Sequence, residues 1–253
     1  MISKKLVLTT VEQHIAKIEL NSPQNNNALS PEMIEQLTYA FEQSENNAQV
    51  HVILLFTKHT NFCSGADLKH MLSLFHKNWD ENLEDAKKFA GIFLRIYNCK
   101  KPVICCVHGN ISAGALGLIS VCDITIADQN AKFQFPEVKL SGVPYAISPF
   151  IVKRIGYAHA TKLMLTAEAF DAAEAKSVGL IDHLAPNSLH YGLIIALEIQ
   201  KNNISSMIET KRWLRAISPI DKNILEESTK FLAQMRMSEK TKEAITNVIK
   251  SKI

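Results

Sequence analysis

Two apolar runs of strand length, each followed by a turn of small residues, dominate the first half of the chain. His51–Phe56 and Val103–Val107 read as strands buried on both faces, because their apolar residues are not interrupted by alternating polar ones. The turns Phe62–Ala66 and His108–Gly114 follow them, and a short helical pattern comes after each turn. A strand, turn and helix unit therefore occurs twice, which predicts an α/β fold.

Further elements are predicted around these units. Lys5–Thr10 and His14–Leu20 resemble paired strands, and Ser30 is expected to cap a helix that starts at Pro31. Helical patterns follow at Glu84–Tyr97, Ala158–Leu165, Ala172–Val178, Leu189–Leu214 and Ile224–Lys250.

One stretch between helices shows weak periodicity. It comprises Leu74–Asn78 and Asp80–Leu83. We expect a mobile segment there, which lies close enough in sequence to the first turn to be a candidate lid.

The two small-residue turns favour an oxyanion hole. A helix that begins among Gly and Ala leaves its first N–H groups unpaired and open to close approach. The N–H groups of Ala66 and Gly114 could therefore bind one oxygen on which negative charge develops. Two ordinary strand-to-helix connections are the alternative interpretation.

Glu137 is an acidic residue in an apolar setting downstream of the second unit. Burial in an apolar pocket would raise its pKa and make it a proton carrier near neutral pH. The alternative is a salt-bridged glutamate, or one at a helix N-terminus, with no chemical role.

Composition limits the possible partners. The chain has 253 residues, 47% of them hydrophobic, and a net charge of +3 with dispersed Lys and Arg, so no nucleic-acid partner is expected. The five cysteines lack zinc-site spacing, which predicts buried reduced thiols and no metal. His108, Asn110 and Asp123 interrupt the apolar stretch 103–127, so we expect no membrane association and a cytoplasmic protein.

Two common motifs are incomplete. Gly109 and Gly114 have the glycine spacing of a phosphate-binding loop, but Ala115 and Leu116 replace the required Lys and Ser or Thr. The nearest match to a serine nucleophile elbow, around Ser112, has one residue too many. A nucleotide loop and a serine hydrolase are therefore disfavoured.

Seven segments together resemble the crotonase superfamily, the enoyl-CoA hydratases and isomerases. They are Ile18–Pro23, Asn27–Leu29, Phe62–Leu68, Lys101–Ile124, Phe135–Glu137, Leu165–Glu168 and Ala172–Leu180. The resemblance implies a crotonase-like spiral of ββα turns over residues 1–190, with the acyl-CoA site, and a C-terminal helical region over 191–253 for capping and trimerisation. It also implies a homotrimer or a dimer of trimers. No separate cofactor is implied, because the coenzyme A thioester is part of the substrate.

The resemblance also assigns roles to residues. Ala66 and Gly114 match the two oxyanion donors, and Glu137 matches the second of the family's two catalytic glutamates. The first glutamate would fall at Gly117, which has no side chain. The implied substrate-binding residues are Ser64, Gly65, Asp67, Leu68, Lys69, Gly117 and Tyr145.

Within the superfamily, the pattern looks most like the bacterial 3-methylglutaconyl-CoA hydratase branch. The supporting segments are Ser64–Met71, Asn82–Ala86, Gly117, Ala146–Val152 and Thr166–Ala172. We therefore expect a hydratase that adds water across the 2,3 double bond of an enoyl-CoA. The alternatives are an isomerase that uses Glu137 alone, and a homologue that binds acyl-CoA without catalysis.

Overall fold

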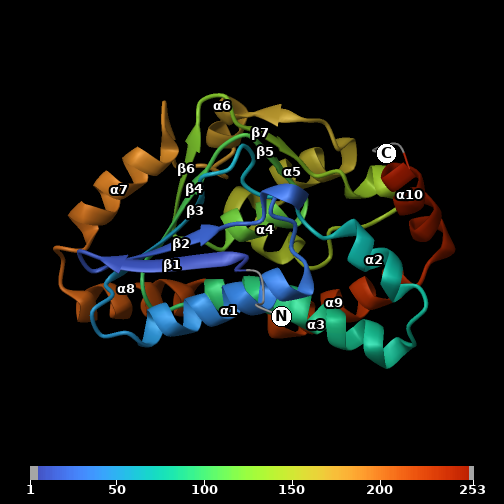
Figure 1. The fold of residues 1–253 in the computed structure, drawn as a ribbon, viewed down its shortest axis with the longest axis horizontal. Coiled ribbons are helices and arrows are strands. Elements are labelled where there is room, and N and C mark those ends of the chain that lie inside the picture. Colours follow the sequence, from blue (N-terminus) through green and yellow to red (C-terminus); the bar gives the residue numbers. More distant parts are fainter. Residues whose placement is uncertain (1–4, 251–253) are drawn as a thin grey trace.

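A six-stranded sheet forms the centre of the computed structural model, which describes residues 5–250 (Figure 1). The strand order is β1-β2-β3-β4-β6-β9; β1 pairs with β2 antiparallel and the other neighbours are parallel. The strands are β1 (Val7–Glu12), β2 (Ile15–Leu20), β3 (Val52–Thr57), β4 (Val103–Val107), β6 (Ile124–Asp128) and β9 (His183–Ala185). The strands expected near residues 5–20, 51–56 and 103–107 are confirmed within two residues at each end.

Helices cover both faces of this sheet, which explains the continuous apolar runs. In β3, Val52, Leu54 and Phe56 pack toward α7 (Ser188–Ile199). Ile53 and Leu55 point the other way, into the larger core shared with α1 (Pro31–Asn46) and α3 (Trp79–Tyr97). Because side chains alternate along a strand, a strand covered on both faces needs apolar residues at every position.

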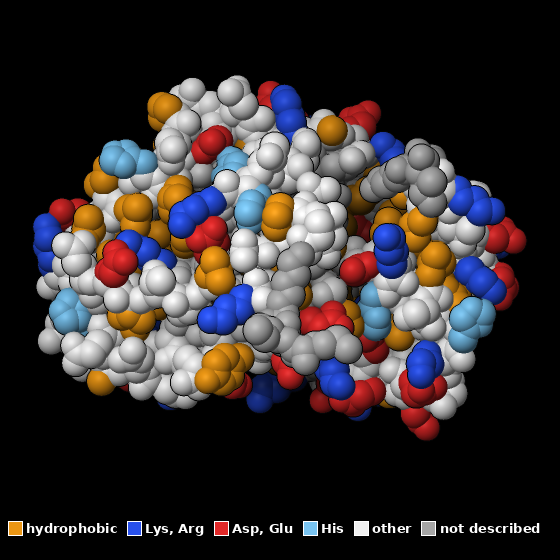
Figure 2. All heavy atoms as spheres, viewed as in Figure 1, with side chains coloured by type: hydrophobic (Ala, Val, Ile, Leu, Met, Phe, Trp, Pro, Cys, Tyr) orange, Lys and Arg blue, Asp and Glu red, His pale blue; other side chains and the backbone are white. Residues whose placement is uncertain are grey.

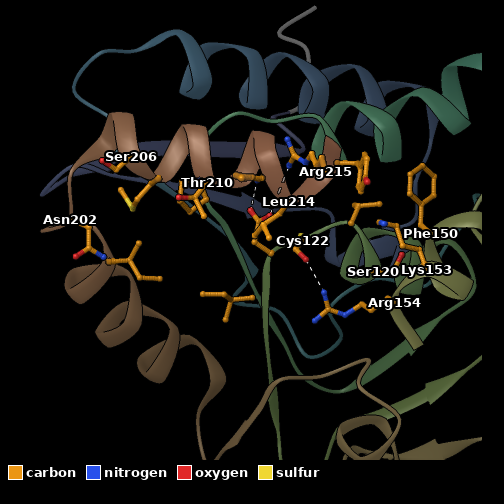
Figure 3. Close-up of a pocket in the computed structure, with 18 of the residues that line it drawn as sticks. Ser120, Cys122, Phe150, Lys153, Arg154, Asn202, Ser206, Thr210, Leu214 and Arg215 are labelled. Atoms are coloured by element: carbon orange, nitrogen blue, oxygen red, sulfur yellow. Dashed lines mark hydrogen bonds and ion pairs between the residues drawn. The ribbon is translucent and has the colours of Figure 1, made fainter. Parts of the chain in front are cut away.

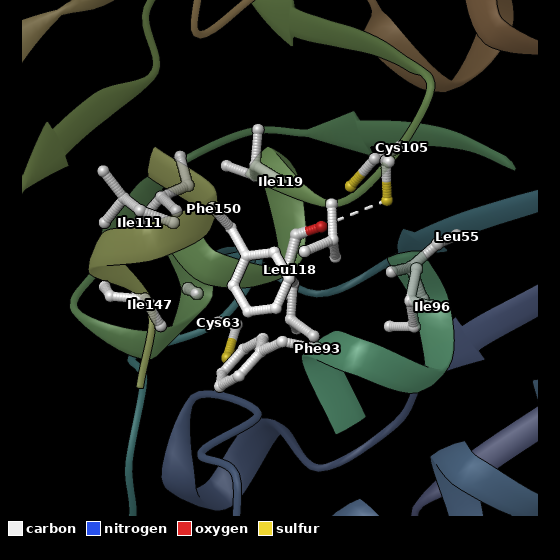
Figure 4. Packing of buried hydrophobic residues seen from close by; sticks show 14 of the residues in the cluster. Leu55, Cys63, Phe93, Ile96, Cys105, Ile111, Leu118, Ile119, Ile147 and Phe150 are labelled. Carbon is white, nitrogen blue, oxygen red and sulfur yellow. Dashed lines mark hydrogen bonds between the residues drawn. The ribbon is translucent and has the colours of Figure 1, made fainter. Parts of the chain in front are cut away.

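The larger core is built around α4 (Gly114–Ser120), whose residues are all buried. Phe93 of α3 and Phe150 of α5 (Ser148–Thr166) pack close together, with ring centroids 6.4 Å apart (Figure 4). Leu118 and Ile147 fill the space beside these rings (Figure 4). This packing fixes α4 beneath the second small-residue turn.

A second, three-stranded sheet has the order β5-β7-β8. Its strands are β5 (Asn110–Ser112), β7 (Lys132–Gln134) and β8 (Phe170–Asp171). The small residues of 108–114 predict only a turn there, whereas the structure places β5 in this segment and pairs it with β7. Three-residue strands are too short to show a period of two.

The remaining helices come from both halves of the chain. They are α2 (Leu68–Leu74), α6 (Ala172–Ser177), α8 (Ile204–Ile217), α9 (Lys222–Arg236) and α10 (Glu239–Lys250), with the short 3-10 helices η1 (Pro23–Asn25) and η2 (Glu137–Leu140). Helix α9 lies against α3, and α10 lies against α2 and η2 (Figure 1). The expected division between residues 190 and 191 falls inside α7; the last three residues of the 191–253 region lie outside the described part.

Two long helical patterns are each broken in the structure. The pattern 189–214 divides into α7 and α8, because the Asn203 side chain accepts the Ser206 N–H and starts a new helix. The pattern 224–250 divides into α9 and α10 after Arg236. Apolar periodicity continues across both breaks, so it could not reveal them.

The segment between helices is shorter than expected, because Asp80–Leu83 belong to the first turns of α3 and only residues 75–78 lie between α2 and α3. Asn78 and Glu81 form a reciprocal capping box that starts the helix. The fully buried Asn82 amide donates to the carbonyls of Leu74, Lys77 and Asn78. These bonds hold the connection between α2 and α3 in place.

The cysteines are buried, and the surface carries charges of both signs. All five cysteines are buried and unbridged, as predicted. Basic and acidic side chains are interspersed on the face shown in Figure 2. Among the helices of residues 5–250, none has the length and apolar character needed to cross a membrane.

Candidate active site

The two small-residue turns lie in direct contact. Gly65 has φ +85°, and a β-carbon built on it would lie 2.7 Å from the Ala113 β-carbon and 2.8 Å from the Gly114 nitrogen. Only glycine adopts this conformation and leaves this space empty. The turn after β3 is therefore packed onto the start of α4, as the oxyanion interpretation requires.

Both predicted donors are unpaired. The N–H groups of Ala66 and Gly114 have no acceptor within residues 5–250. The Leu29 N–H donates to the Gly65 carbonyl at 2.7 Å and holds the first turn. Two unpaired donors on adjacent turns form a site that can accept one carbonyl oxygen.

Backbone strain accompanies the second turn. Ala113 has φ 54° and ψ −125°, a conformation that costs a residue with a side chain about 1–3 kcal/mol. The Ala113 N–H donates to the Gln134 carbonyl of β7 at 3.1 Å, which helps to hold this conformation. Strain of this kind persists where the surrounding structure determines the backbone.

The small sheet brings Glu137 to the same place. Ser112 of β5 pairs with Gln134 of β7, so the chain leaves these strands side by side toward Gly114 and Glu137. Phe135 is fully buried, and its ring stacks on Phe170 with centroids 6.1 Å apart. This anchor fixes the segment that carries Glu137 into η2.

The Glu137 carboxyl group is poorly solvated. Its Oε2 atom is buried and has no hydrogen-bond partner among residues 5–250. Burial raises the pKa of Glu137 from 4.5 to about 7, although a bond to its own backbone acts in the other direction. The expected pKa shift thus agrees with the structure, and a group with this pKa can both accept and donate a proton at neutral pH.

A cavity of about 370 Å³ contains these groups. It is here called the Glu137 cavity. Six of the residues expected at the site line it, namely Ser64, Ala66, Leu68, Gly114, Glu137 and Tyr145. Glu137 is the only carboxylate among its described lining residues.

Other residues expected to bind substrate do not line this cavity. Gly65 lies behind it and shapes the turn. Asp67 caps α2 by accepting the N–H groups of Lys69 and His70 at 2.9 and 3.2 Å. The Lys69 side chain is exposed.

Gly117 lies behind the cavity wall, not on it as the resemblance implied. A β-carbon at this position would lie 2.4 Å from Ile147 Cγ2 and 2.8 Å from Phe93 Cε1. Ile147 itself lines the cavity. The space that a first glutamate would need is therefore filled by apolar side chains.

The C-terminal helices were expected to cap the core, but the residues with which they line the cavity were not predicted. The residues are Leu232, Met235, Arg236, Thr241, Ile245 and Val248. They come about a hundred residues after Glu137 in sequence, and no local pattern marks a helix that will return to a distant turn. The positively charged Arg236 is the unexpected member of this set.

A second cavity, of about 580 Å³, lies among α4, α5 and α8 and shares no lining residue with the Glu137 cavity (Figure 3). Its charged groups already have partners. Arg154 donates to the Cys122 carbonyl at 2.9 Å and pairs with Asp182 at 2.8 Å, and Lys211 pairs with Asp123. Within residues 5–250 no three potential metal ligands lie together.

Comparison with known proteins agrees with this geometry. A family model described as enoyl-CoA hydratase/isomerase matches residues 10–249. The chain belongs to this family. The resemblance to the crotonase superfamily and its fold is thereby confirmed, and the family implies an acyl-CoA substrate.

Individual relatives cover most of the chain. A Thermus thermophilus protein, provisionally assigned as an enoyl-CoA hydratase, is 32% identical over 206 residues and covers 81% of each chain. The 2,3-dehydroadipyl-CoA hydratase of Escherichia coli is 26% identical, over 83% of this chain and 81% of its own. A crystal structure of an enoyl-CoA hydratase from Shewanella pealeana has 30% identity and a TM-score of 0.81, over 97% and 94% of the two chains.

The packing at Gly117 gives a stability prediction. Gly117→Glu should lower the free energy of unfolding by about 3 kcal/mol or more, because it forces a β-carbon into Ile147 and Phe93 and buries a charge. Urea unfolding measures the change. Gly91→Ala in α3 is the matched control: a β-carbon there meets nothing within 4 Å, so stability should rise by about 0.5–1 kcal/mol. Wild-type stability for Gly117→Glu would contradict the packing.

The raised pKa of Glu137 predicts a pH-dependent stability. The folded state favours the neutral carboxyl, so this stabilisation is complete below pH 4.5 and is lost as the pH rises to about 7. A shift of this size corresponds to about 3 kcal/mol. Glu137→Gln should therefore gain stability relative to wild type between pH 5 and pH 8, measured by urea unfolding at both values. A difference independent of pH would show that Glu137 is not desolvated.

Proposed function

We propose that this protein transfers a proton at the α-carbon of an enoyl-CoA thioester, with Glu137 as its single acid–base group. The observation that carries the proposal is a buried carboxyl with a pKa of about 7 in the same cavity as two unpaired backbone N–H groups. Those N–H groups, from Ala66 and Gly114, would bind the thioester oxygen. No other carboxylate lies among the described residues of the cavity wall.

The proposed step moves one proton and one pair of electrons. The Glu137 carboxylate takes a proton from the α-carbon, and the electrons of the C–H bond move onto the thioester oxygen. The two N–H groups stabilise the resulting enolate, and each donor contributes about 3 kcal/mol. If the protonated Glu137 then returns the proton at the γ-carbon, a 3-enoyl ester becomes a 2-enoyl ester.

Isomerisation is the reaction that the cavity supports best. It needs one carboxyl group and no bound water, and the position of the family's first glutamate, at Gly117, is blocked by Ile147 and Phe93. This reverses the order in which the sequence analysis placed hydration and isomerisation.

Hydration is the second candidate. Gln134 and Tyr145 line the cavity with Glu137 and could hold a water molecule beside the β-carbon. Glu137 would then take a proton from that water as its oxygen bonds to the β-carbon and the double-bond electrons move onto the thioester oxygen. The protonated Glu137 would deliver its proton to the α-carbon as the enolate collapses. An E. coli relative is named as a hydratase, and 3-methylglutaconyl-CoA is the specific substrate that the sequence resemblance favours.

Activity tests the proposal directly. The purified protein is given a 3-enoyl-CoA, crotonyl-CoA or 3-methylglutaconyl-CoA, and the absorbance of the conjugated thioester is followed with mass spectrometry of the products. Isomerisation forms the conjugated ester without a change of mass, and hydration removes the conjugation with addition of one water. Because the basic form of Glu137 starts the isomerisation, kcat/KM should rise with pH through about 7.

Glu137→Gln should lower turnover about 10²–10⁴-fold and leave ester binding intact. Glu168→Gln is the matched control, because Glu168 is exposed and does not line the cavity. Unchanged turnover in Glu137→Gln would remove Glu137 from the mechanism. Saturable binding of every ester without turnover would support the non-catalytic alternative.

We also propose a homotrimer or a dimer of trimers, assembled through the C-terminal helices. Trp213, Leu214 and Ile217 of α8 are 60%, 56% and 60% exposed, which leaves an apolar face that nothing within residues 5–250 covers. The mass in solution, measured by light scattering, should be three or six times that of the chain. Trp213→Glu together with Ile217→Glu should reduce it, whereas a monomeric wild type would contradict the assembly.

A further inference from the structure

Arg236, the last residue of α9, is a charged side chain in the core. It is only 2% exposed and is among the largest fully buried side chains of the described chain. An arginine is almost never buried to this degree unless its charge is paired. The partners of its guanidinium group therefore decide what this residue does.

The described residues use only part of the hydrogen-bonding capacity of the guanidinium group. Its Nη1 donates to Asp85 Oδ2 at 2.5 Å, and the other oxygen of Asp85 contacts His70 Nε2 at 2.7 Å. The guanidinium carbon lies 5.4 Å from the centre of the Phe89 ring. Its Nε is buried and has no hydrogen-bond partner within residues 5–250. A charged donor left unpaired in the interior is costly, so an acceptor from a ligand would be bound favourably.

The position of Arg236 relative to the oxyanion donors is set by Phe89. A β-carbon on Gly114 would lie 3.1 Å from Phe89 Cζ, so this ring separates Arg236 from the Gly114 turn. A larger groove of about 1350 Å³, lined by β1, α1, α2 and α3, meets the Glu137 cavity here. Four residues line both spaces, namely Ala66, Met71, Phe89 and Arg236.

Two side chains of opposite charge line the Glu137 cavity. Glu137 and Arg236 are the only carboxylate and the only cationic side chain among its described lining residues. Their roles are separate, because burial and a bond to its own backbone, and no cation, determine the pKa of Glu137. A thioester held at Ala66 and Gly114 thus has a base at one wall and a partly satisfied cation at another.

We propose that Arg236 anchors a carboxylate at the far end of the acyl group, so that the substrates are CoA esters of dicarboxylic acids. The planar guanidinium matches a carboxylate, and Asp85 and His70 orient it from behind. The proposal rests on the proposed function only for the position of the thioester.

The phosphates of coenzyme A are the other source of anionic oxygens. They are separated from the thioester by the whole pantetheine arm, whereas Arg236 lies one aromatic ring from Gly114. The geometry therefore favours the acyl carboxylate.

Saturated esters test this inference without any turnover. Dissociation constants of glutaryl-CoA and valeryl-CoA, and of adipyl-CoA and hexanoyl-CoA, are measured by calorimetry with the full-length protein. Within at least one pair of equal carbon number, the ester with the carboxylate should bind about 10- to 100-fold more tightly. Arg236→Met should abolish this ratio, and Arg236→Lys, which keeps the charge but loses the planar fork, should retain part of it.

The possible outcomes separate the two proposals. Equal or weaker binding of both dicarboxylic esters by wild type would overturn the inference, even if Arg236→Met failed to fold. An equal loss for all esters and for free coenzyme A in Arg236→Met would also overturn it and assign Arg236 to the phosphates. A carboxylate preference in a protein without turnover would support the anchor while the proposed reaction fails.

Discussion

The contact between Gly65 and the Ala113–Gly114 turn is the constraint on which the site depends. No β-carbon fits between these backbones, so the two turns approach closely, as the proposed binding of one oxygen by two N–H groups requires. The turns follow β3 and β4, which are adjacent parallel strands, and their carboxyl ends therefore meet at one edge of the sheet. Strain at Ala113 is tolerated because β7 holds its N–H.

Glu137 shows how the fold accepts a cost in stability for a chemical property. Stacking of Phe135 on Phe170 carries the carboxyl into an apolar cavity, where loss of hydration raises its pKa to about 7. The burial that the proposed proton-carrier role requires also destabilises the folded state as the pH rises to that value. In this proposal, function and stability both follow from the same loss of hydration.

The C-terminal helices complete the cavity from a distance. α9 lies along α3, and α10 lies along α2, so their side chains form the wall opposite the two turns. Arg236 reaches this wall paired with Asp85 of α3, which couples the helix contact to the shape of the acyl site. If Arg236 anchors the acyl carboxylate as proposed, this buried ion pair links helix packing to the selection of substrate.

Local patterns in the sequence determined the buried strands, the Ser30 cap, the two donor turns and the acidic residue between apolar neighbours, because each depends on residues close together in the chain. They did not determine the pairing of β5 with β7, the breaks at Asn203 and after Arg236, or the packing of Ile147 and Phe93 over Gly117. Those features arise from contacts between distant segments. Only tertiary structure decided that one carboxylate and one arginine share the cavity, since burial and neighbours, not spacing, bring them together.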